Sequence, residues 1–190
     1  NSQQATQIAR MNDGRWAVVL GNGYNSHNEH PVLVVQYLDG QSTTAAPSIR
    51  KIAAATGTTG NATANGLSTP RLVDLNGDGT PDVVYAGDLK GNLWKFDTAN
   101  WKGAFATAGC TSCTPRFTAT EKTNTTERQP IVSPPSVRPN STGGMMVAFG
   151  TGQNLEEGDR TDISPQTFYS VLDNTRYKLD TTASNKGKVL

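Results

Sequence analysis

A two-part unit recurs three times along this chain, and it limits the possible folds more than any other feature. Each unit is an apolar strand ending in glycine, a variable loop, a second strand ending in aspartate, and a turn. The closing glycines Gly21, Gly87 and Gly150 are 66 and 63 residues apart. The paired segments are 16–23 with 31–39, 82–88 with 91–97, and 145–152 with 166–173. Such recurrence is typical of propeller blades, so we predict an all-β, partial β-propeller of about three to four blades with long inter-strand loops.

The second unit shows how these strands should pack. The run Val83–Tyr85 is apolar throughout, which predicts an inner strand buried on both faces. The segment 93–96 alternates and predicts a strand with one face toward the neighbouring blade. Trp94 and Phe96 are therefore expected to pack between blades. Because propellers close with about four to eight blades, the visible units would leave apolar faces and sheet edges uncovered.

Composition narrows the class of protein. Of the 190 residues, 35% are hydrophobic and 19 are glycine, which favours strands and turns over helices. Without a run of 18 apolar residues we expect no membrane span, and the scattered basic residues and net charge of +1 give no support for nucleic-acid binding. The chain starts without methionine or a basic leader, so we expect residues 1–190 to be a single partial propeller domain from a longer or processed protein.

The segment 50–71 differs in composition from the strands around it. It is rich in Ala, Thr, Gly and Asn and offers little apolar surface to bury. We therefore predict a surface loop or linker within the domain.

The segment 74–82 reads Asp-Leu-Asn-Gly-Asp-Gly-Thr-Pro-Asp, with a side-chain oxygen at nearly every second position. Calcium takes about six to eight oxygen ligands in flexible geometry, which a short loop can supply. Glycines at positions 77 and 79 permit the left-handed backbone that such wrapping needs. We expect a calcium loop whose ligands are the side chains of Asp74, Asn76, Asp78 and Asp82 and the carbonyl oxygen of Thr80.

Other interpretations of this loop stay open. Clusters of Asp, Asn and Gly also form plain surface turns, and magnesium is a weaker candidate because it prefers rigid octahedral sites. An EF-hand is excluded, since position 12 counted from Asp74 is Tyr85 rather than glutamate. Three like charges repel one another when no metal is bound, so a divalent cation should order the loop.

Cys110 and Cys113 are the two cysteines of the chain. Gly109 and Pro115 flank them, which indicates a loop rather than the βαβ context of a thioredoxin-like motif. A zinc site needs four ligands, and the two histidines lie far away in the sequence. We predict a disulfide-closed loop formed in an oxidising compartment, with two unpaired thiols as the alternative.

Four further motifs complete the pattern. They are Asn-Gly-Tyr-Asn-Ser at 22–26, Ala-Gly-Asp-Leu-Lys-Gly-Asn-Leu-Trp-Lys-Phe-Asp at 86–97, Arg-Gln-Pro-Ile at 128–131 and Phe-Gly-Thr-Gly-Gln at 149–153. With them, the chain from about residue 10 to 175 resembles the C-terminal domain of PilY/PilC-type adhesins, found at the tip of bacterial type IV pili. The resemblance implies a modified, quinoprotein-like β-propeller with one calcium loop, which matches segment 74–82.

The resemblance also implies a function. In that family, calcium occupancy is linked to the balance of pilus extension and retraction, and so to twitching and surface attachment. We therefore expect a non-enzymatic adhesin and biogenesis factor, exported through the periplasm to the pilus tip at the cell surface. Expected partners are minor pilins or other tip subunits, the rest of its own propeller and an N-terminal adhesin domain, and a host or abiotic surface.

Two other functions are compatible with these residues. A quinoprotein-type dehydrogenase uses similar blades, but it needs a cofactor pocket on the axis of a closed ring, and the chain has no adjacent cysteine pair. In the other alternative, calcium only stiffens an interaction domain. Both alternatives, calcium as a switch and calcium as a purely structural ion, predict that calcium binds at 74–82.

Overall fold

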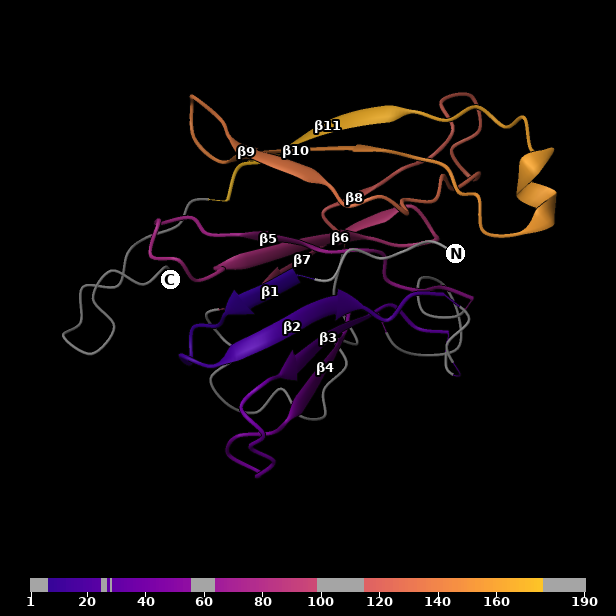
Figure 1. The fold of residues 1–190 in the computed structure, drawn as a ribbon. Helices are drawn as coiled ribbons and strands as arrows, with labels where there is room; N and C mark the ends of the chain where they lie inside the picture. Colours follow the sequence, from indigo (N-terminus) through magenta and orange to yellow (C-terminus); the bar gives the residue numbers. More distant parts are fainter. Residues whose placement is uncertain (1–6, 25–26, 28, 56–63, 99–114, 176–190) are drawn as a thin grey trace.

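In this computed structural model, three antiparallel β-sheets are stacked face to face (Figure 1). The structure describes residues 7–24, 27, 29–55, 64–98 and 115–175. Sheet 1 contains β1 (Gln7–Arg10), β2 (Trp16–Gly21), β3 (Val32–Tyr37) and β4 (Ile49–Ala53). Sheet 2 contains β5 (Arg71–Val73), β6 (Val83–Gly87), β7 (Asn92–Asp97) and β8 (Phe117–Thr118). Sheet 3 contains β9 (Ser136–Pro139), β10 (Met145–Gly150) and β11 (Phe168–Asp173), with β10 in the middle.

Each sheet contains one of the predicted strand pairs, which confirms the all-β prediction. The pairs are β2 with β3, β6 with β7, and β10 with β11. A short 3₁₀ helix, η2 (Glu157–Arg160), interrupts the β10–β11 loop. Among the described residues, no helix is long and apolar enough to cross a membrane.

Two apolar cores hold the three sheets together. The core between sheets 1 and 2 includes Val19 and Val35, which alternate along their strands with residues facing outward. The core between sheets 2 and 3 includes Tyr85 and Val147. All five residues of β6 are buried, as predicted for an inner strand. Each fully buried large apolar side chain contributes roughly 1.5–3 kcal/mol, so the stack depends on both cores.

Strand β7 is packed on both faces, which corrects the prediction of one face toward a neighbouring blade. Trp94 and Phe96 lie in the core with sheet 1, as expected. On the other face, Lys95 Nζ lies 2.7 Å from Asp173 Oδ2 at the end of β11. Tyr85 also donates a hydrogen bond to this carboxylate, at 2.6 Å. These bonds outweigh the effect of burial and hold the pKa of Asp173 below its usual range.

The segment 50–71, predicted as a surface loop or linker, differs from that description at both ends. Residues 50–53 belong to β4, and Asn65, Leu67 and Ser68 are buried. Polar side chains can be buried here because they have partners: Asn65 Nδ2 donates to Asp88 Oδ2 at 2.8 Å, and Ser68 Oγ donates to the Ile131 carbonyl. Gly66 and Ser68 are small enough for a tight crossing between two sheets, which composition alone did not distinguish from a linker.

Glycines at the ends of β2 and β6 leave room for the chain to cross from one sheet to the next. A Cβ atom on Gly21 would lie 2.2 Å from the Ser68 carbonyl oxygen, and one on Gly87 would lie 2.3 Å from Ile131 Cγ2. Both glycines are therefore required where the segment entering the next sheet passes over the strand end. At the equivalent Gly150 of sheet 3, a Cβ atom would meet no atom of the described residues within 4 Å.

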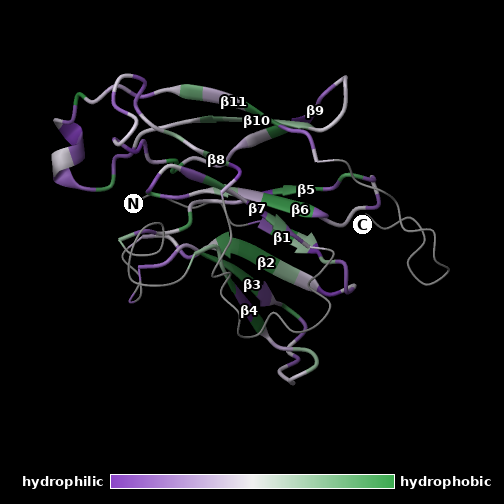
Figure 2. Ribbon diagram, turned by 180° about the vertical axis from the view of Figure 1, so that it is seen from behind, coloured by the Kyte–Doolittle hydropathy of each residue, from purple (hydrophilic) through white to green (hydrophobic). Residues whose placement is uncertain are grey.

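The two outermost sheet faces carry exposed apolar side chains. On sheet 1 these include Trp16, which is 56% exposed, and on sheet 3 they include Phe168, which is 75% exposed. Figure 2 shows hydrophobic residues along much of β2 and in parts of β11. Exposed apolar faces of this kind normally pack against another element.

Candidate metal centre

The predicted calcium loop connects β5 to β6 in sheet 2. Val73 and Val83 are paired across its base, and the Asp82 amide donates to the Val73 carbonyl at 2.8 Å. Gly77 and Gly79 adopt φ angles of 78° and 82°, the left-handed conformation expected from the sequence. The loop therefore folds back on itself between two paired strands.

Asp74 organises the first half of the loop. Its Oδ1 accepts hydrogen bonds from the amides of Asn76 and Gly77, the latter at 2.7 Å. Its Oδ2 accepts from the Gly79 amide at 2.8 Å. One carboxylate thus gathers three backbone N–H groups, which is how Asp favours turns.

Asn76, Asp78 and Thr80 continue the same pattern. Asn76 Oδ1 accepts from the Asp78 amide at 3.0 Å, and Asp78 Oδ1 accepts from the Thr80 amide at 2.8 Å. Asn76 Nδ2 also donates to Asp78 Oδ2 at 3.2 Å. The alternating polar side chains therefore point into one turn, as the spacing predicts.

Asp82 differs from the other two acids because it is buried, at 2% exposure, whereas Asp74 and Asp78 are exposed. Its Oδ2 accepts from the Leu75 amide at 2.7 Å. Burial raises the pKa of Asp82, and the charges of Asp78 and Asp74 raise it further. The three carboxylates are thus near enough to repel, and no basic residue lies within 74–82.

The residues fit calcium by their chemistry, although their oxygens are turned toward the loop itself. Every predicted ligand offers oxygen, which calcium prefers. Within the ranges that the structure describes, no three His, Cys, Asp or Glu side chains are gathered as a metal site. The exposed carboxylates at 74 and 78 instead accept the backbone hydrogen bonds described above, so binding requires these oxygens to turn toward the ion. The Thr80 carbonyl remains a predicted ligand.

Two residues that sequence reasoning missed fasten this loop to its surroundings. Asn12, between β1 and β2, donates to the Pro81 carbonyl at 3.1 Å and accepts from Thr80 Oγ1 at 3.2 Å. Thr98, after β7, receives a hydrogen bond from Asn12 at 2.9 Å and donates to Pro81. No local motif signals these contacts, because the partners of Asn12 are 68 to 86 residues away in sequence. The loop is thereby connected to sheet 1.

The other predicted site lies outside the described residues. Cys110 and Cys113 fall within 99–114, so their disulfide stays a prediction.

Comparison with known proteins places these features in a family. The sequence model of the PilY1 beta-propeller domain matches residues 2–189. The chain is 40% identical over 184 residues to the type IV pilus biogenesis factor PilY1 of Pseudomonas aeruginosa PAO1, covering 87% of this chain and 15% of that protein. It is 34% identical over 178 residues to a PilY1 homolog of Xylella fastidiosa, covering 87% of this chain and 12% of that protein.

A solved structure agrees with the sequence matches. The crystal structure of the Pseudomonas aeruginosa PilY1 C-terminal domain matches with a TM-score of 0.73 at 36% identity. The match covers 91% of this chain and 37% of that one. The chain therefore spans well under half of the solved domain and less than a fifth of its curated relatives. The three sheets are part of a β-propeller.

Proposed function

Because the chain belongs to the family of PilY1 β-propeller domains, we propose that it is the calcium-binding propeller domain of a type IV pilus tip-associated adhesin and biogenesis factor. Calcium occupancy of the loop 74–82 modulates pilus extension and retraction, twitching and surface attachment. Homology to a pilus biogenesis factor favours a non-catalytic role. The site of action is the pilus tip at the cell surface, reached through the periplasm.

One observation carries the calcium assignment. Asp82 is a buried carboxylate, and the carboxylates of Asp74 and Asp78 lie in the same loop, which contains no basic residue. A buried negative charge without a compensating cation is costly. When bound, calcium supplies the positive charge that relieves this repulsion, and affinity follows the number of charged ligands.

The hydrogen bonds of Asn12 suggest how occupancy reaches the rest of the molecule. Because Asn12 forms hydrogen bonds with both Thr80 and Pro81, a movement of the loop 74–82 would displace the turn between β1 and β2 in sheet 1. A partner that binds this end of the stack would contact two neighbouring blades. Minor pilins or other tip subunits, the rest of the propeller and the N-terminal adhesin domain are the partners we propose, together with a host or abiotic surface.

A test in cells separates a calcium switch from a structural ion. Asp78→Ala is introduced into the full-length protein, with Glu157→Ala as the control because Glu157 is exposed and distant in sequence from the loop. We expect Asp78→Ala to change surface piliation and twitching at normal protein levels, and the control to behave as the unchanged protein. Loss of the protein itself would instead favour a structural ion, and unchanged motility would contradict the proposal.

A further inference from the structure

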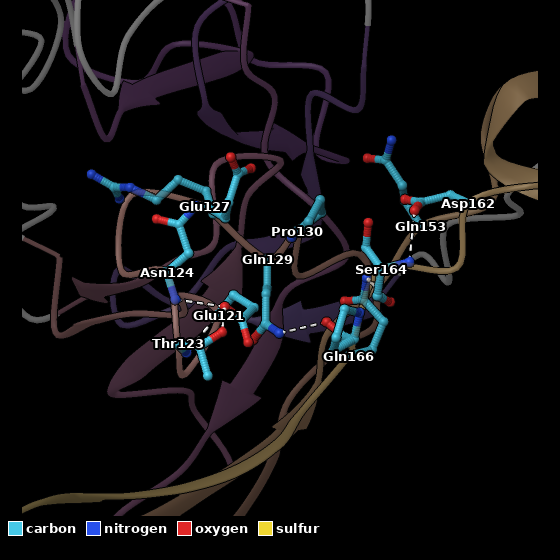
Figure 3. A pocket seen from close by; sticks show the side chains of 12 residues that line it. Glu121, Thr123, Asn124, Glu127, Gln129, Pro130, Gln153, Asp162, Ser164 and Gln166 are labelled. Atoms are coloured by element: carbon cyan, nitrogen blue, oxygen red, sulfur yellow. Dashed lines mark hydrogen bonds between the residues drawn. The ribbon is translucent and has the colours of Figure 1, made fainter.

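A polar cavity of about 540 Å³ lies at the opposite ends of the strands from the loop 74–82. One wall is the segment 121–130, which leads into sheet 3, and the other consists of Gln153 and residues 162–166 of the β10–β11 loop, without η2 (Figure 3). Its volume falls within the range of small-molecule sites. The cavity shares no lining residue with the predicted calcium loop.

The walls of the cavity are held in place before any ligand arrives. Gln129 is buried at its floor, donates to the Pro165 carbonyl at 2.7 Å and accepts from Tyr169 at 3.1 Å. Glu121 accepts from the Thr123 amide at 3.0 Å, which fixes the turn of one wall. A preorganised site loses less entropy on binding, so even hydrogen bonds of ordinary strength can yield affinity.

The rim offers both hydrogen-bond acceptors and donors. In the part of the chain that the structure describes, the Glu127 carboxylate accepts no hydrogen bond and forms no ion pair. Exposed amides of Asn124, Gln153 and Gln166 and the hydroxyl of Ser164 surround the same opening (Figure 3). An amide both donates and accepts, as does a hydroxyl, so this set matches ligands rich in hydroxyl groups.

The net charge of the lining disfavours an anionic ligand. The carboxylates of Glu121, Glu127 and Asp162 line the cavity together with the guanidinium of Arg128, so three acids face one base. Arg128 Nη1 also donates to Asn92 Oδ1 of sheet 2 at 3.2 Å. This net negative lining disfavours a ligand of the same sign, so phosphorylated or acidic ligands should bind poorly.

We propose that this cavity binds a short neutral oligosaccharide. Hydroxyl groups of the sugar pair with Glu127 and with the amides of the rim, while the rings of Pro130 and Pro165 supply apolar surface for its C–H face. The assignment goes beyond the calcium-dependent role and does not require calcium in the loop 74–82. A negative result for oligosaccharide binding therefore does not contradict calcium binding at 74–82, and the reverse also holds.

Screening on a glycan array of neutral and sialylated oligosaccharides tests this assignment. We expect retention of a subset of neutral glycans and no retention of their sialylated forms, with or without calcium. Calorimetry with the retained oligosaccharide then compares Glu127→Ala and Gln166→Ala with Glu157→Ala, an exposed acid outside the cavity. Loss of one hydrogen bond to a charged group should weaken binding about tenfold in Glu127→Ala, and Glu157→Ala should bind as the unchanged chain.

Three results would overturn the proposal. One is an array on which no neutral glycan is retained. Another is that Glu127→Ala and Gln166→Ala bind the oligosaccharide as tightly as the unchanged chain does, while their thermal unfolding is unchanged. The third is binding of a lysine-rich peptide that Glu127→Ala abolishes, which would assign the cavity to basic side chains of a partner protein.

Discussion

At the scale of single residues, Asp82 is the group through which we propose that the loop responds to protons and metal. Its pKa lies above the usual value of 3.8 because of burial and because of the neighbouring carboxylates. A raised pKa means that protonated Asp82 stabilises the folded, metal-free chain. This contribution is fully present below pH 3.8 and is lost as the pH rises through the raised pKa. A cation bound in the loop should reverse this dependence of stability on pH.

We therefore expect Asp82→Asn to stabilise the metal-free chain at neutral pH, because it removes the buried charge. The Tm should rise by roughly 2–4 °C, the shift that about 1 kcal/mol produces in a domain of this size. The gain should shrink at acidic pH, and calcium should no longer raise the Tm. Calorimetric unfolding at neutral and acidic pH measures both effects, and a calcium shift that survives the substitution would exclude Asp82 as a ligand.

At the scale of elements, the strands and the packing of Trp94 and Phe96 between blades could be predicted, and the polar contacts between sheets could not. The run 83–85 is β-branched or aromatic throughout and the run 145–150 is apolar, so their strand character is visible locally. The positive φ angles at Gly77 and Gly79 likewise follow from the sequence of the loop. The role of Asn12 depends on folding, because its partners belong to another sheet.

Asn12→Ala should disconnect the loop from sheet 1 while leaving its predicted ligands intact. We expect calcium still to bind, and stability to fall by about 1 kcal/mol for the lost hydrogen bonds. Hydrogen exchange should show calcium-induced protection within 74–82 but no longer at the turn 11–15. Protection at that turn in the variant would mean that another contact transmits the change.

The buried ion pair of Lys95 and Asp173 joins sheet 2 to sheet 3. Breaking this pair should cost more stability than Asn12→Ala does. Lys95→Met should destabilise the chain by about 3–5 kcal/mol, since Asp173 keeps its charge in a buried position. Lys51→Met, at an exposed lysine of β4, should change stability by less than about 0.5 kcal/mol. Urea unfolding compares the two, and equal stabilities would show that the pair is dispensable.

At the scale of the whole molecule, the outer faces of the stack indicate further blades. Trp16 and Phe168 are exposed on opposite outer sheets, and no described residue lies against Gly150 where its counterparts meet a crossing segment. We infer that a further segment of the propeller crosses Gly150 and covers β11. Sequence alone indicated missing blades, but only the contacts at Gly21 and Gly87 show where the next segment would pass.

Two matched substitutions test that placement. Gly87→Ala should destabilise this chain by about 1–3 kcal/mol or more, because the new Cβ atom collides with Ile131. Gly150→Ala should have little effect in this chain but a cost like that of Gly87→Ala in a protein containing the complete propeller. Thermal unfolding of both variants in both contexts measures this, and a neutral Gly150→Ala in the longer protein would contradict the placement.

Calorimetric titration of calcium into this chain and into Asp78→Ala tests the central claim most directly. We predict one site with a dissociation constant in the micromolar to millimolar range, as in sensor and extracellular calcium loops, and loss of binding in the variant. The same titration with Glu157→Ala should match the unchanged chain. Absence of binding to the unchanged chain, or equal binding by Asp78→Ala, would contradict a calcium site at residues 74–82.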